Sequence, residues 1–371
     1  MDPATICCPK LACPARGQVG QGPIGIHSHQ EPRFVCRQCR KTFTATKGTA
    51  FSRWRTPADR VTLVLTRLAH GCPLQAIVVA CAGDERTVAA WMARAGEQSR
   101  AVHAYLVEQP RDLGQVQADE IRVKQQGGVV WMALALLVRT RWWLAGAVSA
   151  PRDLPLRRRL LEQVRTCALC QALLFCTDGW CSYGRAIRET FRDAVYTGAC
   201  GRPSWRPWPQ LLIAQVVKRY PQRRVVGVER RISQGTATKV EQVRAASPGD
   251  GVINTADIER LNATFRERLA ALTRRGRALA RQLGTLEPGM YLMGTVSNFC
   301  PMHASLRVAR TTAVADTRTP AMAAAITAHC WTVRELLAFH VPPPRWTPPK
   351  QRGRPARALQ RLRARWCRDH D

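Results

Sequence analysis

Residues 115–123 read Gln-Val-Gln-Ala-Asp-Glu-Ile-Arg-Val, and this stretch decides how the long central region of the chain is interpreted. Polar and apolar residues alternate through it, as they do in a β-strand with one face in a core. Asp119 lies at the centre of the segment, with Glu120 beside it. A carboxylate in a buried strand is costly unless a cation pairs with it. The segment therefore predicts a strand that carries a charged site.

The residues that follow predict more strands and a second acid. Apolar runs at 129–138 and 142–148, separated by short turns, complete a meander of three strands with residues 115–123. A helix is expected near 156–164, and then a buried strand that ends at Asp178. A divalent cation would account for both Asp119 and Asp178. Taken alone, Asp178 could equally be a turn residue before Gly179. A strand pair is also expected at 211–217 and 224–232.

A third acid lies on a predicted helix at residues 254–277. Its apolar face contains Ile258, Leu261, Phe265, Leu269 and Leu272, whereas Glu259, Asn262 and Arg266 form a separate polar stripe. An ordinary surface helix with solvated charges would look similar. Acids on a strand, a strand end and a helix are nevertheless the arrangement that holds two Mg²⁺ ions in a ribonuclease-H-like fold, and such ions prefer oxygen ligands.

The first 45 residues contain two closely spaced cysteine pairs, Cys8 with Cys13 and Cys36 with Cys39. Four thiolates in two pairs can reach one tetrahedral Zn²⁺, and the segment between them then forms a zinc ribbon. Cys7 could replace Cys8 as a ligand. The alternative is that these cysteines are unrelated free thiols. Phe34, Val35 and Phe43 are the expected core.

Residues 57–97 predict three short helices. Helices are expected from 57 to about 69 and from 74 to 82, and Asp84 can cap a third helix that runs to Gly96. Arg86, Thr87 and Arg94 are expected on its outer face. A short helix, a glycine turn and a helix with polar residues at its start are typical of a helix-turn-helix, although any three-helix domain gives a similar pattern.

Composition favours a nucleic-acid partner. The chain has 371 residues, with 57 Lys and Arg against 26 Asp and Glu, and a net charge of +31. Such a charge favours a polyanion, although arginine-rich usage could also reflect codon bias. No signal peptide begins the sequence, and its longest apolar run, Val129 to Val138, is too short to span a bilayer. A soluble cytoplasmic protein is expected, whose 15 cysteines are thiols and metal ligands.

Three motifs together resemble the D-D-E transposases of bacterial insertion sequences. The motifs are Asp119-Glu120, residues 177–180 (TDGW) with Tyr183, and residues 258–262 (IERLN) with Arg266 and Arg275. The chain is most similar to the insertion-sequence-one type, whose members also begin with a zinc finger and a helix-turn-helix. The resemblance implies that Asp119, Asp178 and Glu259 are catalytic ligands of Mg²⁺ or Mn²⁺. A following segment with His303 also resembles transposases, and His303 could approach DNA.

We therefore predict a multi-domain chain. The expected parts are a zinc ribbon (1–50), an all-α helix-turn-helix domain (51–100), an α/β ribonuclease-H-like catalytic domain with a mixed sheet (112–310), a C-terminal helix (311–340) and a basic disordered arm (341–371). In the arm, Arg352-Gly-Arg354-Pro is similar to an AT-hook core, which places guanidinium groups in a narrow minor groove. Non-specific phosphate contact is the alternative for the arm. Cys167, Cys170, Cys176 and Cys181 are expected to be buried or free thiols.

The expected activity is cleavage and strand transfer at the inverted repeats of a bacterial insertion sequence. Its partners would be double-stranded DNA and further copies of the chain, with no membrane and no small-molecule substrate. DNA contacts are expected from Arg86, Thr87, Arg94, Asn262, Arg266, Arg352 and Arg354. One alternative is a catalytically inactive zinc and helix-turn-helix regulator derived from a transposase. A nuclease or junction resolvase with the same fold is another.

Overall fold

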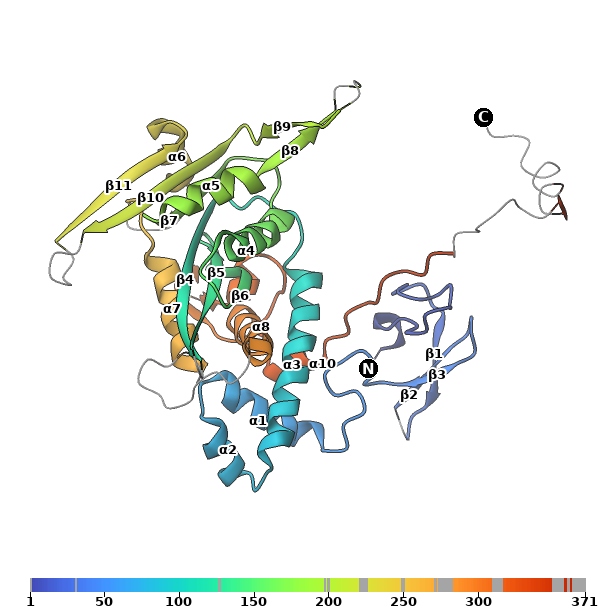
Figure 1. The fold of residues 1–371 in the computed structure, drawn as a ribbon. Coiled ribbons are helices and arrows are strands. Elements are labelled where there is room, and N and C mark those ends of the chain that lie inside the picture. The colour runs from blue at the N-terminus through green and yellow to red at the C-terminus, as the bar shows by residue number, and fades with distance from the viewer. Residues whose placement is uncertain are drawn as a thin grey trace. The chain divides into compact units, whose positions relative to one another are not determined.

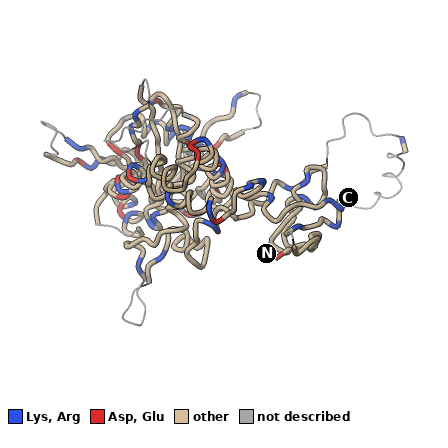
Figure 2. The backbone as a smooth tube through the Cα atoms, turned by 90° about the horizontal axis from the view of Figure 1, so that it is seen from below, with Lys and Arg blue, Asp and Glu red and all other residues tan. Residues whose placement is uncertain are grey.

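The computed structural model describes residues 2–30, 32–125, 128–196, 198, 201–219, 226–247, 251–269, 272, 283–308, 316–348, 357–358 and 361. The chain divides into two compact units (Figure 1). The first comprises Met1–Gly48 with Pro342–Asp371, and the second comprises Thr49–Val341. Lys and Arg are distributed along both units (Figure 2). Among the described helices, none combines the length and the apolar composition needed to cross a membrane.

The first unit is a small antiparallel sheet with few core residues. Its strands are β1 (Ile24–Ser28), β2 (Arg33–Cys36) and β3 (Thr42–Thr44), and a short 3₁₀ helix, η1, covers Pro3–Thr5. Phe34 and Phe43 face each other across the β2–β3 pair, with ring centroids 6.0 Å apart. Both phenylalanines are buried as expected, but Val35 is only half-buried because it lies on the other face of β2.

The described beginning of the C-terminal tail packs on this small sheet unit. Residues 342–348 have no regular secondary structure, and the Arg16 guanidinium donates to the carbonyl oxygen of Pro344 over 3.2 Å. Gly17 has a φ of +69°, and a Cβ atom there would lie 2.3 Å from the Pro343 carbonyl oxygen. The close approach of the tail therefore requires glycine at this position.

The second unit begins with three helices, α1 (Ala58–Ala69), α2 (Leu74–Ala80) and α3 (Glu85–Leu106). Asp84 caps α3 as expected, since its Oδ2 accepts a hydrogen bond from the Thr87 backbone N–H over 2.9 Å. The prediction that this helix ends at Gly96 is wrong. A Cβ at Gly96 would lie 2.4 Å from the backbone of Pro288, in α8 (Leu283–Phe299). The glycine therefore provides room for a neighbouring helix instead of ending its own.

The centre of this unit is a six-stranded mixed sheet. Its order is β11-β10-β7-β4-β5-β6, and the strands are β4 (Gln115–Gln125), β5 (Gly128–Leu137), β6 (Trp142–Ser149), β7 (Leu173–Asp178), β10 (Leu211–Arg219) and β11 (Gly227–Gln234). The predicted meander of β4, β5 and β6 is confirmed, as is the predicted pairing of β10 with β11, which is antiparallel. β7 is parallel to both β4 and β10, so these three strands run in the same direction.

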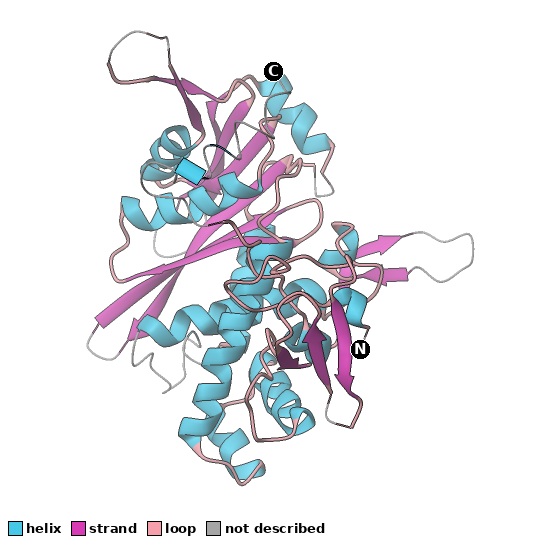
Figure 3. Cartoon of the chain, turned by 90° about the vertical axis from the view of Figure 1, so that its right-hand side faces the viewer, coloured by secondary structure: helices cyan, strands magenta, loops and turns pink. Residues whose placement is uncertain are grey.

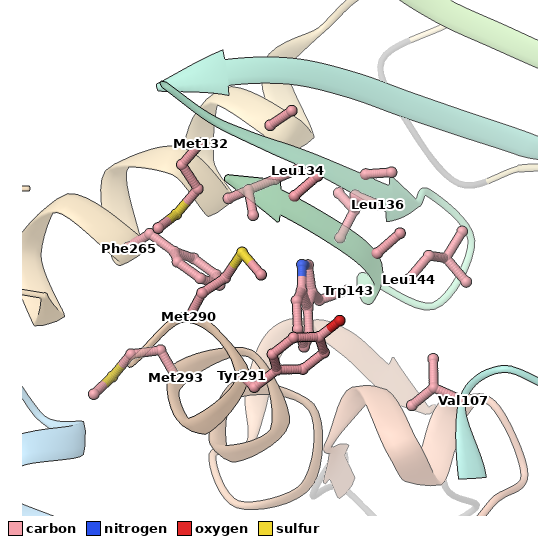
Figure 4. Close-up of a cluster of buried hydrophobic side chains, with 14 of the residues drawn as sticks. Val107, Met132, Leu134, Leu136, Trp143, Leu144, Phe265, Met290, Tyr291 and Met293 are labelled. Carbon is pink, nitrogen blue, oxygen red and sulfur yellow. The ribbon is translucent and has the colours of Figure 1, made fainter. Parts of the chain in front are cut away.

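Helices cover both faces of the sheet (Figure 3). On one face lie α4 (Leu154–Cys167) and α5 (Cys181–Thr190), where Phe175 of β7 packs on Phe191 at 5.1 Å. On the other face, Trp143 of β6 contacts Tyr291 of α8 and Phe265 of α7 (Ala256–Arg268), as Figure 4 shows. Leu174 and Cys176 also point to this second face and pack on Val240 of α6 (Ala237–Ala245). The sheet is therefore the centre of a large apolar core.

Several elements differ from the sequence-based expectation at their ends. The predicted helix 254–277 begins at Ala256 and ends at Arg268, because Leu269 adopts an extended conformation with a φ of −97° and a ψ of 109°. In the described part of 311–340, β13 (Asp316–Arg318) pairs with β12 (His303–Val308). Two short helices follow, α9 (Pro320–Ala323) and α10 (Val333–Ala338), and Thr319 and Thr332 cap their separate starts. A hairpin of β8 (Arg192–Val195) and β9 (Ser204–Pro207) extends from the second unit.

Candidate metal centres

Two parallel strands bring Asp119 and Asp178 together. Ala118 of β4 is in register with Thr177 of β7, so Asp119 and Asp178 occupy the next positions on adjacent strands. β7 ends at Asp178, whereas β4 continues. Carboxylate oxygens of Asp119, Glu120 and Asp178 lie within 4.8 Å of one another. Two of the three predicted acids therefore belong to one compact acidic group, which also includes Glu120.

Glu120 differs from the other two acids because both of its carboxylate oxygens are paired with arginines. Its side chain is fully buried, and its two oxygens accept hydrogen bonds of 2.8 Å from Arg157 Nε and Arg152 Nη2. Arg157 comes from α4, on the sheet face opposite α7. Arg152 also approaches Asp178, at 3.6 Å. Glu120 therefore fastens α4 to β4, and its charge is compensated without a metal ion.

The side chain of Gln117 fixes the start of α7 over β4. Gln117 Oε1 accepts from the Ile258 N–H over 2.9 Å, and its Nε2 donates to the Asn254 carbonyl oxygen over 3.0 Å. One helical turn later, Asn262 Nδ2 donates to Asp119 Oδ2 over 2.8 Å. Gln117 and Asp119 are two residues apart on β4 and share a face, so the strand sets the position of the helix. The polar stripe predicted for this helix is thereby directed at the strand acid.

Glu259 faces the same cavity, but its carboxylate is outside the 4.8 Å acidic group. It forms an ion pair with Lys218 of β10 and accepts a hydrogen bond from Thr255 Oγ1 over 2.8 Å. The cavity has a volume of about 640 Å³. It is lined by Asp119, Asp178, Gly179, Trp180, Val216, Val217, Lys218, Thr255, Glu259, Asn262 and Arg266. We call it the acid cavity.

The ionisation of these acids reflects their surroundings. Burial raises the pKa of Asp119 to about 6, and the nearby charges of Asp178, Glu120 and Glu259 act in the same direction. Burial and the charge of Glu120 also raise the pKa of Asp178. Burial acts to raise the pKa of Glu259, but the hydrogen bonds from Lys218 and Thr255 outweigh it and hold this pKa below its usual value.

The acid cavity has the donor set of a site for a hard divalent cation. Asp119 and Asp178 both supply carboxylate oxygens, and a cation bound between them would relieve the charge repulsion that raises the pKa of Asp119. The Asn262 side-chain oxygen Oδ1 is buried and has no hydrogen-bond partner among the described residues. It offers another neutral oxygen beside Asp119, to which the same side chain donates.

The second candidate centre is the group of four cysteines in the first unit. The Sγ atoms of Cys8, Cys13, Cys36 and Cys39 all lie within 4.8 Å of one another. Cys8 and Cys39 are 3.7 Å apart, and Cys13 and Cys36 are 3.8 Å apart. Tetrahedral zinc with Zn–S bonds of about 2.3 Å requires sulfurs about 3.8 Å apart. The four thiols thus fit one zinc ion, and Cys8 takes the position for which Cys7 was the alternative.

The residues predicted to contact DNA fall into three groups. Arg86 and Thr87 are exposed in the first turn of α3. Arg94 is half-buried, with its guanidinium donating to the Ser52 carbonyl oxygen and lying 5.3 Å from the Trp54 ring centroid. Asn262 and Arg266 line the acid cavity. The remaining two, Arg352 and Arg354, are outside the described residues.

The sequence did not point to four polar residues that position the acids, namely Arg152, Arg157, Lys218 and Gln117. Arg152 and Arg157 lie in a stretch rich in arginine, where nothing distinguishes them from surface residues. Gln117 had a usable signal, since a polar residue two positions before Asp119 must share its sheet face. Cys167 and Cys176 are buried, and Cys170 is exposed. Among the described residues these three form no metal-binding group.

No protein-family model matches this chain, and no curated protein is significantly similar to it.

Proposed function

We propose that this protein is a DNA transposase that cleaves and joins DNA strands with the help of divalent metal ions. One observation carries the proposal: carboxylates from β4, the end of β7 and α7 face a single open cavity. This is the strand, strand-end and helix pattern of a ribonuclease-H-like catalytic domain, and the mixed sheet supports that fold. The net charge of +31 suits a polyanionic substrate.

The residues of the acid cavity would divide the work. Asp119, Asp178 and Glu259 would hold Mg²⁺ or Mn²⁺, which when bound stabilises the attacking and leaving oxygens of an in-line phosphoryl transfer. Asn262 holds the Asp119 carboxylate in place. Lys218, now paired with Glu259, would turn to the phosphate backbone of the bound strand. Arg266, also in the cavity, is a second cation for that backbone.

The N-terminal parts would read the ends of the element. Zinc would hold the four cysteines and give the small module its fold. Arg86 and Thr87, exposed at the start of α3, would contact bases, as residues at this position do in a helix-turn-helix. Arg94 is better suited to fixing Ser52 and Trp54 than to contacting DNA. Arg352 and Arg354 remain a proposed minor-groove element. Joining two ends in one reaction would require several copies of the chain on DNA, in a bacterial cytoplasm.

The direct test is cleavage of the DNA that borders the gene. Purified protein is incubated with labelled duplexes from both flanks in the presence of Mg²⁺ or Mn²⁺. The proposal predicts nicks at a fixed position on each flank that leave a 3′-hydroxyl, with no nicks for Glu259→Gln. Specific binding without cleavage under any metal condition would instead identify a DNA-binding regulator. Preferential cutting of branched duplexes would indicate a junction resolvase.

A further inference from the structure

A second cavity lies on the other flank of α7. It has a volume of about 160 Å³, is partly open, and is lined mainly by residues of α7, α8, the β5–β6 turn and the start of β12. The α7 residues that line it are 257, 260, 261, 264 and 268, spaced at three, four and seven positions. Glu259, Asn262 and Arg266 fall on a different side of the helix. This second cavity is therefore separate from the acid cavity.

Positive charge predominates in the second cavity. Three guanidinium groups, from Arg141, Arg260 and Arg268, line it together with the ring of His303. Asp257 is the one acid in the lining, and Arg141 pairs with it. Among the described residues no carboxylate lies within 4 Å of Arg260 or Arg268, so their charges are not compensated by ion pairs. Thr264 and Ser297 add hydroxyl groups, and Arg268 donates to Ser297 Oγ over 3.4 Å.

His303 presents a hydrogen-bond donor in these surroundings. Its Nδ1 accepts from the Ser305 backbone N–H over 3.3 Å and lies 2.9 Å from Ser305 Oγ. Because the backbone N–H can only donate, the neutral ring carries its proton on Nε2. Burial, together with the positive charges of Arg141 and Arg260, lowers the pKa of His303. The ring therefore lies in a positive electrostatic potential, which a bound anion would reduce.

The backbone at Arg141 is held in an uncommon conformation. Arg141 has a φ of 57°, in the left-handed region that favours glycine, within the tight turn between β5 and β6. Its side chain is mostly buried, and its Nε donates to Ser305 Oγ over 3.3 Å. Ser305 therefore contacts both Arg141 and His303. Three elements that are distant in the sequence thus converge on one positively charged hollow.

We propose that this second cavity binds a single phosphate group of a nucleic-acid backbone, at a point separate from the strand that reacts in the acid cavity. Guanidinium, hydroxyl and imidazole donors are the groups that bind phosphate oxygens. The cavity is smaller than sites for drug-sized ligands, so it suits one phosphate and not a whole nucleotide. The choice of nucleic acid as the source of the phosphate rests on the proposed function.

The phosphate site itself is tested with inorganic phosphate and the full-length protein. Histidine ring signals are followed by NMR, and the His303 signal is assigned by its loss in His303→Gln. We expect that signal to shift and saturate with phosphate but not with chloride at equal ionic strength. Arg260→Ala and Arg268→Ala should each weaken the response at least about tenfold. A His303 signal that phosphate leaves unchanged overturns the site.

The nucleic-acid source is tested by binding to a duplex over a range of salt concentrations. Removal of one phosphate contact should reduce the slope of log K against log salt by about 1. We expect this for Arg260→Ala and for Arg268→Ala, but not for the control Arg185→Ala. Arg185 is an exposed arginine on α5, on the opposite face of the sheet.

The two measurements separate failure of this site from failure of the proposed function. Unchanged slopes in both variants overturn the nucleic-acid assignment, even where the His303 signal responds to phosphate. A protein that shows the expected NMR and salt effects but never cleaves DNA retains this site and loses the proposed function.

Discussion

The two candidate metal centres are built in opposite ways. The four cysteines lie in a module whose small core consists of the cysteines themselves with two isoleucines, two phenylalanines and two alanines. The acid cavity lies at the end of β7, in the middle of a sheet with a large apolar core on both faces. In the first unit an ion would substitute for a core. In the second, the core holds carboxylates close together although they repel one another.

This difference predicts what a metal ion would contribute at each centre. Metal binding at a tetrahedral thiolate site supplies folding free energy, so the module would unfold when the ion is removed. At the acid cavity the acids are held in place without an ion. The strands, the side chain of Gln117 and the two arginines that pair with Glu120 position them. A metal there would be available for chemistry. Four substitutions test this difference between the two centres.

Loss of the thiolate site should unfold the first unit alone. Binding of structural zinc is worth about 10–16 kcal/mol, far more than this small core supplies. We expect Cys36→Ser to abolish stoichiometric zinc and make residues 1–48 susceptible to protease, while a fragment containing 49–341 persists. Cys7→Ser, which alters a cysteine outside the group, is the matched control and should retain zinc. A protease-resistant first unit without zinc would contradict this account.

Loss of a cavity acid should abolish chemistry without loss of the fold. We expect Asp178→Asn to reduce the rate of DNA cleavage at least about 1000-fold, equivalent to about 4 kcal/mol of transition-state stabilisation. Affinity for flanking DNA and the thermal midpoint should change little, because Asp178 is partly exposed at the end of its strand. Single-turnover cleavage measures the effect. Cleavage within tenfold of the unmodified protein would exclude Asp178 from the site.

Glu120 should behave in the opposite way, as a structural acid. Glu120→Ala leaves the buried Arg157 without its partner, which typically costs about 3–5 kcal/mol of folding free energy. The exposed Glu162→Ala on α4 is the control and should cost less than about 0.5 kcal/mol. Urea unfolding followed by tryptophan fluorescence provides the comparison. Equal stabilities of the two variants would mean that Glu120 does not fasten α4 to β4.

The repulsion at Asp119 should appear as a pH dependence of stability. Its pKa is raised from 3.8 to about 6 in the folded protein. Between these values the folded state binds a proton that the unfolded state lacks, so the free energy of unfolding falls as pH rises. The fall should be about 1–2 kcal/mol, because solvent reaches part of the site. In magnesium-free buffer, Asp119→Asn should lose this fall between pH 4 and 7. An unchanged pH profile would contradict the raised pKa.

Much of the framework could be predicted because it depends on local patterns. Alternation located β4, apolar runs located β5 and β6, and paired spacing identified the four cysteines. Asp119 was expected within one buried strand and Asp178 at the end of another, and both lie where they were expected. These features need only the neighbouring residues in the sequence.

The features that were missed depend on contacts between distant segments. Gly96 looked like a helix end, but its role is set by Pro288 in another helix. Arg94 was expected at the surface, yet Ser52 and Trp54 hold it. The different fates of Asp119 and Glu120 depend on which helix covers each face of β4, and adjacent letters in a sequence do not reveal that.

The central claim is that acids from β4, β7 and α7 form one metal site, and Mn²⁺ binding to the full-length protein tests it most directly. Calorimetric titration should show binding that Asp119→Asn, Asp178→Asn and Glu259→Gln each weaken at least about tenfold, with Glu162→Gln unchanged. Glu259 is the decisive variant, because its carboxylate is paired with Lys218. Mn²⁺ affinity unaltered by Glu259→Gln would contradict the account and reduce the site to Asp119 and Asp178.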